Sequence, residues 1–281
     1  MTWRCLEHPF DLSAQGEIMG ILNVTPDSFS DGGQFDRVEA AVEKALSMLE
    51  EGAAIIDIGG ESTRPGAADV SAGDEQARVL PAIEAILAEV PDACLSIDTS
   101  KASVAKAAVK AGASIINDVT GFRDPGMIEV AAESGAGIVA MHMQGTPRTM
   151  QSAPSYDNVV EEIRSFFEQK HAELLAAGIQ PEAIVYDPGI GFGKTLEHNL
   201  TLLRHLDQLT VADRPILLGV SRKSFIGKLI GSDEVADRNA PTIAITSQAR
   251  EQGVMLHRVH EVQSNLEAMR MTEAMLHGVT G

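Results

Sequence analysis

The feature that most constrains the fold of this chain is one pattern repeated eight times: a short apolar run, a loop rich in Gly, Asp or Ser, and a longer amphipathic stretch. The apolar runs are rich in β-branched residues and nearly continuous in apolar character, as strands buried on both faces should be. They predict strands at Glu17–Val24, Ala54–Gly60, Cys94–Thr99, Ser114–Thr120, Gly137–His142, Ala183–Gly189, Pro215–Ser221 and Val254–His260. The amphipathic stretches predict helices at Arg37–Glu51, 74–89, 101–111, 126–134, 156–177, 196–207, 241–251 and 261–277.

Strands that alternate with helices indicate an α/β protein. Eight such units without a composition break or a Pro/Ser-rich linker predict a single closed (β/α)8 TIM barrel. We expect one domain over residues 1–281, a length that suits a fold of typically about 250 residues. A doubly wound open sheet is the alternative, but it usually has fewer strands and a glycine-rich fingerprint in its first turn, which is absent after Val24.

The charge balance narrows the class of partner. The chain has 22 basic and 40 acidic residues, a formal net charge of −18. This argues against nucleic acid or an anionic membrane surface as a partner, because both attract a basic face. An anionic small molecule is compatible with this charge only where a few local cations override the field of the whole chain.

Cysteine usage and the N-terminal segment indicate the compartment. Cys5 and Cys94 are too few for a disulfide framework, and their spacing fits no zinc motif. The segment Met1–Leu12 lacks the apolar core of a secretory signal, and no stretch reaches the roughly 18 uninterrupted apolar residues of a membrane span. We therefore expect a cytoplasmic protein.

Polar side chains follow every predicted strand. In barrels of this class the chemistry lies on the loops after the strands, at the C-terminal rim. A single rim carboxylate often only caps the next helix, but polar groups at all eight strand ends favour a functional site. The residues concerned are Asn23, Asp57, Glu61–Arg64, Asp98, Asn117, Asp118, His142, Asp187, Ser221–Lys223, Arg258 and His260.

The last strand carries two histidines that flank an arginine. On a strand, side chains two positions apart share a face and those three apart do not. Arg258 and His260 therefore face the barrel mouth together, where we interpret them as a clamp for an anion. His257 is expected on the helix side.

Two motifs allow more than one interpretation. The run Pro188–Thr195 nearly matches a phosphate-binding P-loop, but Pro188 stands where that motif requires glycine. Its glycines are better explained by close approach of the backbone to a flat ligand beside Asp187. Lys223 suits either a Schiff-base lysine or a hydrogen-bond donor to a ring, since both use a buried, oriented amine.

Two long segments carry a resemblance to a known family. Met19–Gly33 resembles the first signature of the dihydropteroate synthase family, and Gly52–Gly66 resembles the second. Matches to shorter family motifs follow in the same order over residues 17 to 277, at Ser96–Ser100, Ile116–Asp118, Met141–Met143, Asp187–Gly189, Ser221–Ser224 and Arg258–His260.

The resemblance implies a barrel enzyme that condenses 6-hydroxymethyl-7,8-dihydropterin diphosphate with p-aminobenzoate to give 7,8-dihydropteroate and pyrophosphate. The residue types suit these ligands. A carboxylate accepts two parallel N–H bonds from a pterin edge, an amide both donates and accepts, and a guanidinium can lie over the ring while reaching a phosphate. In this reaction, loss of pyrophosphate would run ahead of attack by the amine.

The resemblance also implies a role for each matched residue. The pterin would be bound by Asp98, Asn117, Asp187, Lys223 and Arg258. The diphosphate would be bound by Asn23, Arg64, Arg258 and His260, with a Mg²⁺ cofactor held in part by Asn23. The p-aminobenzoate slot would be formed by Phe29, Thr63, Pro65, Phe192 and Ser224. Catalysis would rest on Asp31, Lys223 and Arg258, with Asp31 stabilising the cationic carbon.

One departure from the family pattern follows Arg238, where relatives usually show a Gly-Ser/Thr pair and this chain reads Asn239-Ala240-Pro241-Thr242. Because the family's dimer contact lies near this helix, the expected homodimer is less firmly implied than the fold. Three other functions stay open: a pterin-binding methyltransferase, a non-catalytic pterin binder, and a Schiff-base lyase that uses Lys223. The methyltransferase does not require the Asn23–Gly33 loop, which this chain has.

Overall fold

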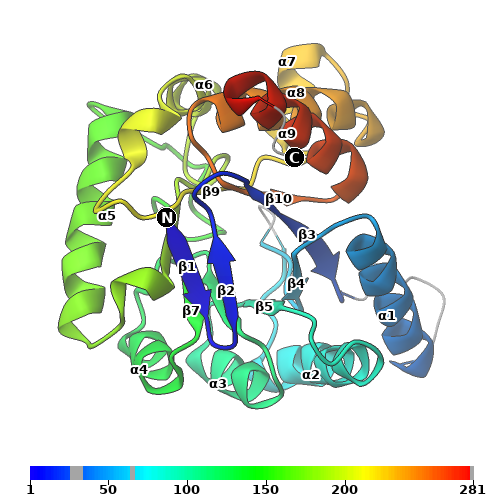
Figure 1. The fold of residues 1–281 in the computed structure, drawn as a ribbon. Helices are drawn as coiled ribbons and strands as arrows, with labels where there is room; N and C mark the ends of the chain where they lie inside the picture. Colours follow the sequence, from blue (N-terminus) through cyan, green and yellow to red (C-terminus); the bar gives the residue numbers. More distant parts are fainter. Residues whose placement is uncertain (26–33, 64–66, 279–281) are drawn as a thin grey trace.

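The computed structural model describes residues 1–25, 34–63 and 67–278 (Figure 1). Eight parallel strands form one sheet in the order β8-β7-β6-β5-β4-β3-β10-β9. They are β3 (Glu17–Asn23), β4 (Ile55–Gly59), β5 (Leu95–Asp98), β6 (Ile115–Asp118), β7 (Gly137–Met141), β8 (Ile184–Asp187), β9 (Leu217–Leu218) and β10 (Leu256–Val259). A parallel bridge between Tyr186 and Ile216 joins the two outer strands and closes the sheet. The predicted (β/α)8 barrel is confirmed.

The helices surround this sheet (Figure 1). They are α1 (Gln34–Glu50), α2 (Ala72–Glu89), α3 (Ala102–Lys110), α4 (Pro125–Ser134), α5 (Val159–Ala176), α6 (Leu196–Arg204), α7 (Ser224–Ile230), α8 (Asn239–Glu251) and α9 (Val262–His277), with short 3-10 turns at Pro181–Ala183, Leu206–Leu209 and Ala236–Arg238. The sequence did not predict α7. With seven residues, this helix is too short to show an amphipathic repeat.

The inside of the barrel is layered. One inward position in each strand, or directly before it in the case of β5, is apolar, and these side chains pack in one buried cluster: Met19, Ile55, Cys94, Ile115, Val139, Val185, Leu217 and Leu256. Two residues further along four of the strands, the inward positions are Asp57, Asn117, Asp187 and Arg258. Because alternate residues of a strand share a face, the polar groups lie directly above the apolar layer, at the C-terminal rim.

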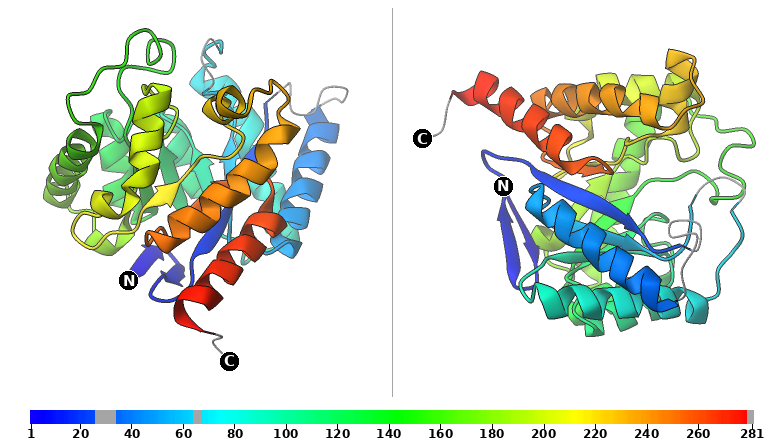
Figure 2. Two further views of the ribbon diagram at one scale, coloured as in Figure 1. Left: turned by 90° about the horizontal axis from the view of Figure 1, so that it is seen from above. Right: turned by 90° about the vertical axis from the view of Figure 1, so that its right-hand side faces the viewer.

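An N-terminal hairpin, which the sequence pattern did not predict, closes the opposite end. Its strands β1 (Thr2–Cys5) and β2 (His8–Asp11) are antiparallel, and the right-hand view of Figure 2 shows them at one end of the barrel. Trp3 is fully buried against the apolar layer, and its Nε1 donates to the Ala183 carbonyl at 3.0 Å. The hairpin therefore leaves the C-terminal rim as the end that can receive a ligand.

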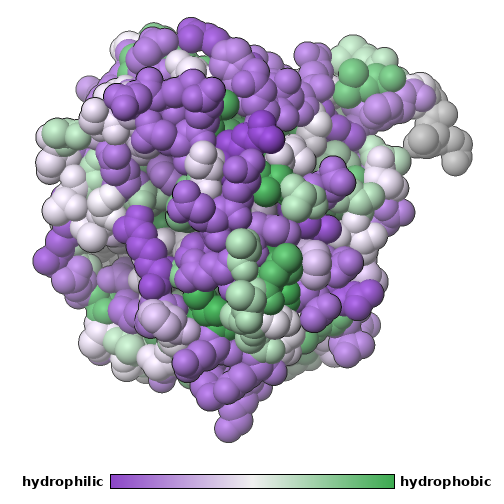
Figure 3. Space-filling view, turned by 90° about the vertical axis from the view of Figure 1, so that its left-hand side faces the viewer, coloured by the Kyte–Doolittle hydropathy of each residue, from purple (hydrophilic) through white to green (hydrophobic). Residues whose placement is uncertain are grey.

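The face shown in Figure 3 is largely hydrophilic, with small separate hydrophobic areas. Within the described ranges, the structure has no helix with the length and apolar character needed to cross a bilayer.

Candidate active site

Arg258, on β10, bridges two carboxylates at the rim. Its Nε donates to Asp57 Oδ2 at 2.6 Å, and its Nη2 donates to Asp98 Oδ2 at 2.7 Å. Asn117 Nδ2 donates to the same Asp57 oxygen at 3.1 Å. Strands β10, β4, β5 and β6 thus converge on one hydrogen-bonded group. With Asp187 and Lys223, these four residues are called the rim cluster below.

Some buried oxygens at the rim have no partner among the described residues. Asp57 is fully buried, yet its Oδ1 makes no hydrogen bond to any described residue, and the same is true of Asp98 Oδ1 and Ser96 Oγ. Burial raises the pKa of the Asp98 carboxyl to about 7; Arg258 opposes this increase and Asp57 adds to it. Buried acceptors normally find donors, so these oxygens are suited to the N–H groups of a ligand.

Glycines leave space beside Asp187. A Cβ at Gly219 would lie 3.5 Å from Asp187 Oδ2 and 4.0 Å from Arg258 Cβ, so the missing side chain leaves a gap between these two groups that a methyl group would fill. Gly189, whose N–H donates to Asp187 Oδ1 at 2.7 Å, has φ +64°, and a Cβ there would lie 1.9 Å from the His142 carbonyl oxygen. Only glycine fits this turn. Burial raises the pKa of Asp187, while Lys223 lowers it.

Lys223 precedes α7 and reaches back over the loop after β8. Its Nζ donates to the Ile190 carbonyl and lies 4.5 Å from the centre of the Phe192 ring. Burial lowers the pKa of Lys223 to about 8, and Asp187 opposes that decrease. The bond to the Ile190 carbonyl shows this amine acting as a hydrogen-bond donor.

His260 and Ser221 form a pair at the ends of β10 and β9. Ser221 Oγ lies 2.9 Å from His260 Nδ1, and the His260 backbone N–H donates to the same oxygen at 3.1 Å. His257 is buried on the other side of β10, where Arg250 of α8 and Glu273 of α9 act on it electrostatically. The orientations expected from strand alternation are thus observed.

Lys194 shows the structural role of the run Pro188–Thr195, which nearly matches a P-loop. Its Nζ is buried and bonds the carbonyls of Gly189 (2.9 Å) and Phe192 (3.0 Å) and His142 Nδ1 (3.1 Å). Burial lowers the pKa of Lys194 well below its usual value. The amine is thus committed to holding the loops after β7 and β8 together, which excludes the P-loop function.

The remaining predicted residues are placed only in part. Thr63 is half-buried after β4, Phe192 packs on a group of methionines after β8, and Ser224 is the exposed first residue of α7. The other predicted residues, Phe29, Asp31, Arg64 and Pro65, lie outside the described residues.

The surroundings of Asn23 can be tested for a metal. A Cβ at Gly59 would lie 3.6 Å from Asn23 Oδ1 and 3.7 Å from Asp98 Oδ2, so two oxygens border a space that a side chain would fill. Among the described residues no three His, Cys, Asp or Glu side chains gather as a metal site. A Mg²⁺ held here would take most of its ligands from phosphate and water, as Mg²⁺ commonly does. The residues fit an ion that binds together with a phosphate ligand.

Asp57 and Lys194 are the residues that the sequence-based assignment of site roles missed. Asp57 was visible as an inward residue at a strand end, but its contacts with Arg258 and Asn117 depend on barrel closure. Lys194 was visible only as part of a glycine-rich run, whose glycines were interpreted as room for a flat ligand and whose lysine was given no role.

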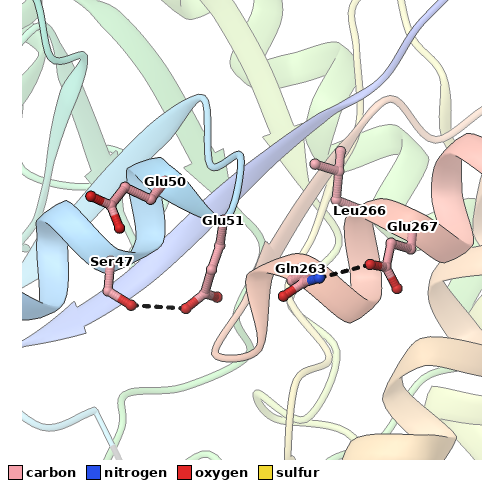
Figure 4. A pocket seen from close by; sticks show the side chains of 6 residues that line it. All are labelled: Ser47, Glu50, Glu51, Gln263, Leu266 and Glu267. Atoms are coloured by element: carbon pink, nitrogen blue, oxygen red, sulfur yellow. Dashed lines mark hydrogen bonds between the residues drawn. The ribbon is translucent and has the colours of Figure 1, made fainter.

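A groove lies away from the rim, between α1 and α9 (Figure 4). Its polar side chains bond within their own helices: Ser47 Oγ to Glu51 Oε1, and Gln263 Nε2 to Glu267 Oε1, both at 2.9 Å. The lining of Ser47, Glu50, Glu51, Gln263, Leu266 and Glu267 carries no basic residue. This groove lacks the paired donors and acceptors of the rim.

Comparisons with known proteins point to one family. A family model described as "Pterin binding enzyme" matches residues 19–260. The dihydropteroate synthase of Escherichia coli (strain K12) is 47% identical over 271 residues, which cover 96% of this chain and 93% of the relative.

Solved structures are similar over nearly the whole chain. Yersinia pestis dihydropteroate synthase, crystallised with a sulfonamide drug, has a TM-score of 0.91 and 45% identity, covering 98% of this chain and 99% of the relative. Xanthomonas albilineans dihydropteroate synthase with 4-aminobenzoic acid has a TM-score of 0.91 and 42% identity, with 98% of each chain covered. A further structure of that enzyme, with 7,8-dihydropteroate, has a TM-score of 0.89 and 39% identity, with 99% of each chain covered.

Proposed function

This chain belongs to the dihydropteroate synthase family, and on that premise we propose how its barrel rim carries out the reaction of folate biosynthesis. The enzyme is a transferase that joins 6-hydroxymethyl-7,8-dihydropterin diphosphate to p-aminobenzoate and releases 7,8-dihydropteroate and pyrophosphate. The observation that carries the proposal is the rim cluster, where Arg258 joins two carboxylates that each keep one oxygen without a partner in the described part of the chain.

The rim cluster recognises the pterin. Asp187 accepts paired N–H groups from the pterin edge, with its Oδ2 at the gap beside Gly219. Asn117 gives its N–H to Asp57, so its carbonyl oxygen is left to accept from the ring. Lys223, which donates to the Ile190 carbonyl in this structure, donates to the ring carbonyl or a ring nitrogen. Arg258, held by Asp57 and Asp98, presents the face of its guanidinium to the ring.

The diphosphate is bound at the outer side of this cluster. We assign it to Asn23, Arg64, Arg258 and His260, and we assign Mg²⁺ to Asn23 with phosphate and water as its other ligands. The bound Mg²⁺ would neutralise charge on the oxygens of the departing pyrophosphate. The supporting observation is the space between Asn23 Oδ1 and Asp98 Oδ2 beside Gly59.

The bond changes define what the residues must do. The C–O bond to the diphosphate breaks, with its electron pair leaving on pyrophosphate, and a C–N bond to the amine of p-aminobenzoate forms; the amine then loses a proton. Arg258 and His260 stabilise the leaving group, which is the larger demand if cleavage precedes attack. Asp31 is assigned to the cationic carbon. Phe29, Thr63, Pro65, Phe192 and Ser224 form the amine's slot.

Release of pyrophosphate tests this function. With the pterin diphosphate and Mg²⁺ present, addition of p-aminobenzoate should start stoichiometric release of pyrophosphate and formation of 7,8-dihydropteroate, and EDTA should stop both until Mg²⁺ is restored. Binding without release would instead indicate a non-catalytic pterin binder. Trapping of Lys223 by borohydride with a carbonyl substrate would indicate the lyase.

Two features bear on assembly and compartment. Met271 and Met275 lie one turn apart on α9 and are 62% and 63% exposed, and the next residue, Leu276, is 46% exposed. This apolar stripe supports our proposal of a homodimer that uses α9, because exposed apolar patches often mark interfaces.

Cys5 and Cys94 are free and buried, which is in keeping with the cytoplasm, the compartment that we propose.

A further inference from the structure

The Ser221 hydroxyl is shared between two atoms of His260. The His260 backbone N–H can only donate, so at 3.1 Å it uses Ser221 Oγ as an acceptor. The contact of 2.9 Å between Oγ and Nδ1 can run in either direction, depending on which atom carries the proton. Since a serine has one hydroxyl proton, the direction of this contact decides the tautomer of the histidine.

Counting donors and acceptors resolves the direction. If Nδ1 carried the proton, Ser221 Oγ would accept twice and its own proton would need another acceptor. Ser221 is 8% exposed, and in the described part of the chain its hydroxyl has no third partner. A buried hydroxyl without an acceptor is unfavourable. The hydroxyl proton therefore points to Nδ1, and the ring proton of the neutral histidine is on Nε2.

We propose that Ser221 is a positioning residue that holds His260 in the Nε2–H tautomer, so that the ring offers a donor to the diphosphate. This inference rests on the proposed role of His260 in diphosphate binding. The oxygens of a diphosphate only accept hydrogen bonds, so the opposite tautomer would turn a lone pair toward an anion. A fixed tautomer removes that unproductive form before the substrate arrives.

Arg222 explains how Ser221 is held in place. It has φ +57°, a left-handed conformation that non-glycine residues rarely adopt. Its N–H donates to Thr242 Oγ1 (3.3 Å), its carbonyl accepts from Arg238 Nη1 (3.1 Å), and its Nε donates to Asn239 Oδ1 (2.7 Å). The run from Asn239 to Thr242, where this chain departs from the family pattern, thus anchors the turn that carries Ser221.

The tautomer can be measured without turnover. The full chain, labelled with ¹⁵N-histidine, is compared by NMR as the wild type, Ser221→Ala and Ser221→Thr. In the wild type and in Ser221→Thr, which keeps the hydroxyl, His260 should show a proton on Nε2 and none on Nδ1. In Ser221→Ala both tautomers should be populated. His260→Asn assigns the signal.

Binding supplies the second readout. Ser221→Ala should weaken binding of pyrophosphate with Mg²⁺ about tenfold, the effect of one misdirected hydrogen bond. It should change binding of the pterin alcohol, which has no phosphate, less than about twofold. Ser47→Ala is the matched control, because it removes a side-chain hydrogen bond of equal length in the distant groove (Figure 4).

Two results would overturn the inference. One is a wild-type His260 with its proton on Nδ1, or on both nitrogens, at neutral pH; the other is equal loss of both ligands in Ser221→Ala. The NMR result does not depend on catalysis. Failure of this inference is therefore distinguishable from failure of the proposed function, which pyrophosphate release tests.

Discussion

Asp57→Asn changes the charge at the centre of the rim cluster and preserves its shape. The asparagine oxygen can still accept from Arg258 Nε and from Asn117 Nδ2, as Asp57 Oδ2 does now. Its NH2 group would then occupy the place of Oδ1, the buried oxygen that has no partner among the described residues. An acceptor suited to a pterin N–H would become a donor facing that N–H.

Asp57→Asn should affect the stability of the protein and its catalytic activity by different amounts. For stability, the ion pair with Arg258 becomes a hydrogen bond from a charged donor to a neutral acceptor, a loss of about 1–2 kcal/mol in the free energy of unfolding. Asp98 still pairs with the same guanidinium, which limits that loss. For catalysis, a charged acceptor is replaced by an opposing donor. We expect kcat/KM for the pterin diphosphate to fall by about 10- to 100-fold.

The assay compares chemical denaturation with pyrophosphate release at saturating p-aminobenzoate. Asp118→Asn is the control, because Asp118 is equally buried and next to Asn117, but it accepts from Thr120 and from the Phe122 N–H instead of from Arg258. It should lose stability and keep kcat/KM. A stable Asp57→Asn enzyme with kcat/KM within about threefold of wild type would refute the assignment of Asp57 to pterin binding.

Three further outcomes are expected. Gly219→Ala should keep the wild-type Tm, because the new Cβ makes contacts no shorter than 3.5 Å, but a fluorescence titration should show that it no longer binds the pterin. Gly189→Ala should fail to fold, because its Cβ would lie 1.9 Å from a carbonyl oxygen. Lys223→Arg should lose about 10- to 100-fold in kcat/KM, because a planar fork does not fit the place of an ammonium; full activity would remove Lys223 from the site. Burial lowers the pKa of His257 to about 4 in the folded protein, whereas an ordinary histidine has a pKa near 6.5. As the pH falls below 6.5, the unfolded chain therefore binds a proton that the folded protein does not. The free energy of unfolding should drop by roughly 3 kcal/mol between pH 6.5 and 4. His257→Leu should flatten that part of a urea-denaturation pH series, whereas the exposed His277→Leu should not.

The sequence predicted most of the barrel because its strands are buried on both faces and its helices are amphipathic. The strand predicted at Pro215–Ser221 is the exception, since only Leu217–Leu218 forms regular pairs. Pro215 has no N–H for a ladder, although its carbonyl accepts from the Tyr186 N–H at 3.2 Å. The alternation of side chains along a strand was sufficient to predict on which face of the strand His257 and Arg258 lie.

Other features depend on contacts between distant segments. The hairpin β1–β2 has only four residues in each strand, and its Trp3 is buried by strands that begin later in the chain. The pairing of Arg258 with Asp57 and Asp98 requires the last strand to close on the first ones. No local pattern encodes such partners, so the sequence indicated which side chains reach the rim and not which of them bond.

The pairing of Arg258 also bears on how a chain of net charge −18 binds a diphosphate. A guanidinium has five N–H donors, and Asp57 and Asp98 engage two of those of Arg258. With Asp187, the rim cluster holds three carboxylates against two cations, Arg258 and Lys223. It therefore offers no surplus positive charge, which suits a neutral pterin and not a phosphate. We therefore assign the attraction for the diphosphate mainly to groups beyond the cluster: Mg²⁺, Arg64 and His260, whose ring contacts Ser221. Binding of pyrophosphate should accordingly depend on Mg²⁺ and His260 more than on the charge of Arg258, whose main task is to hold the acceptors for the pterin in place.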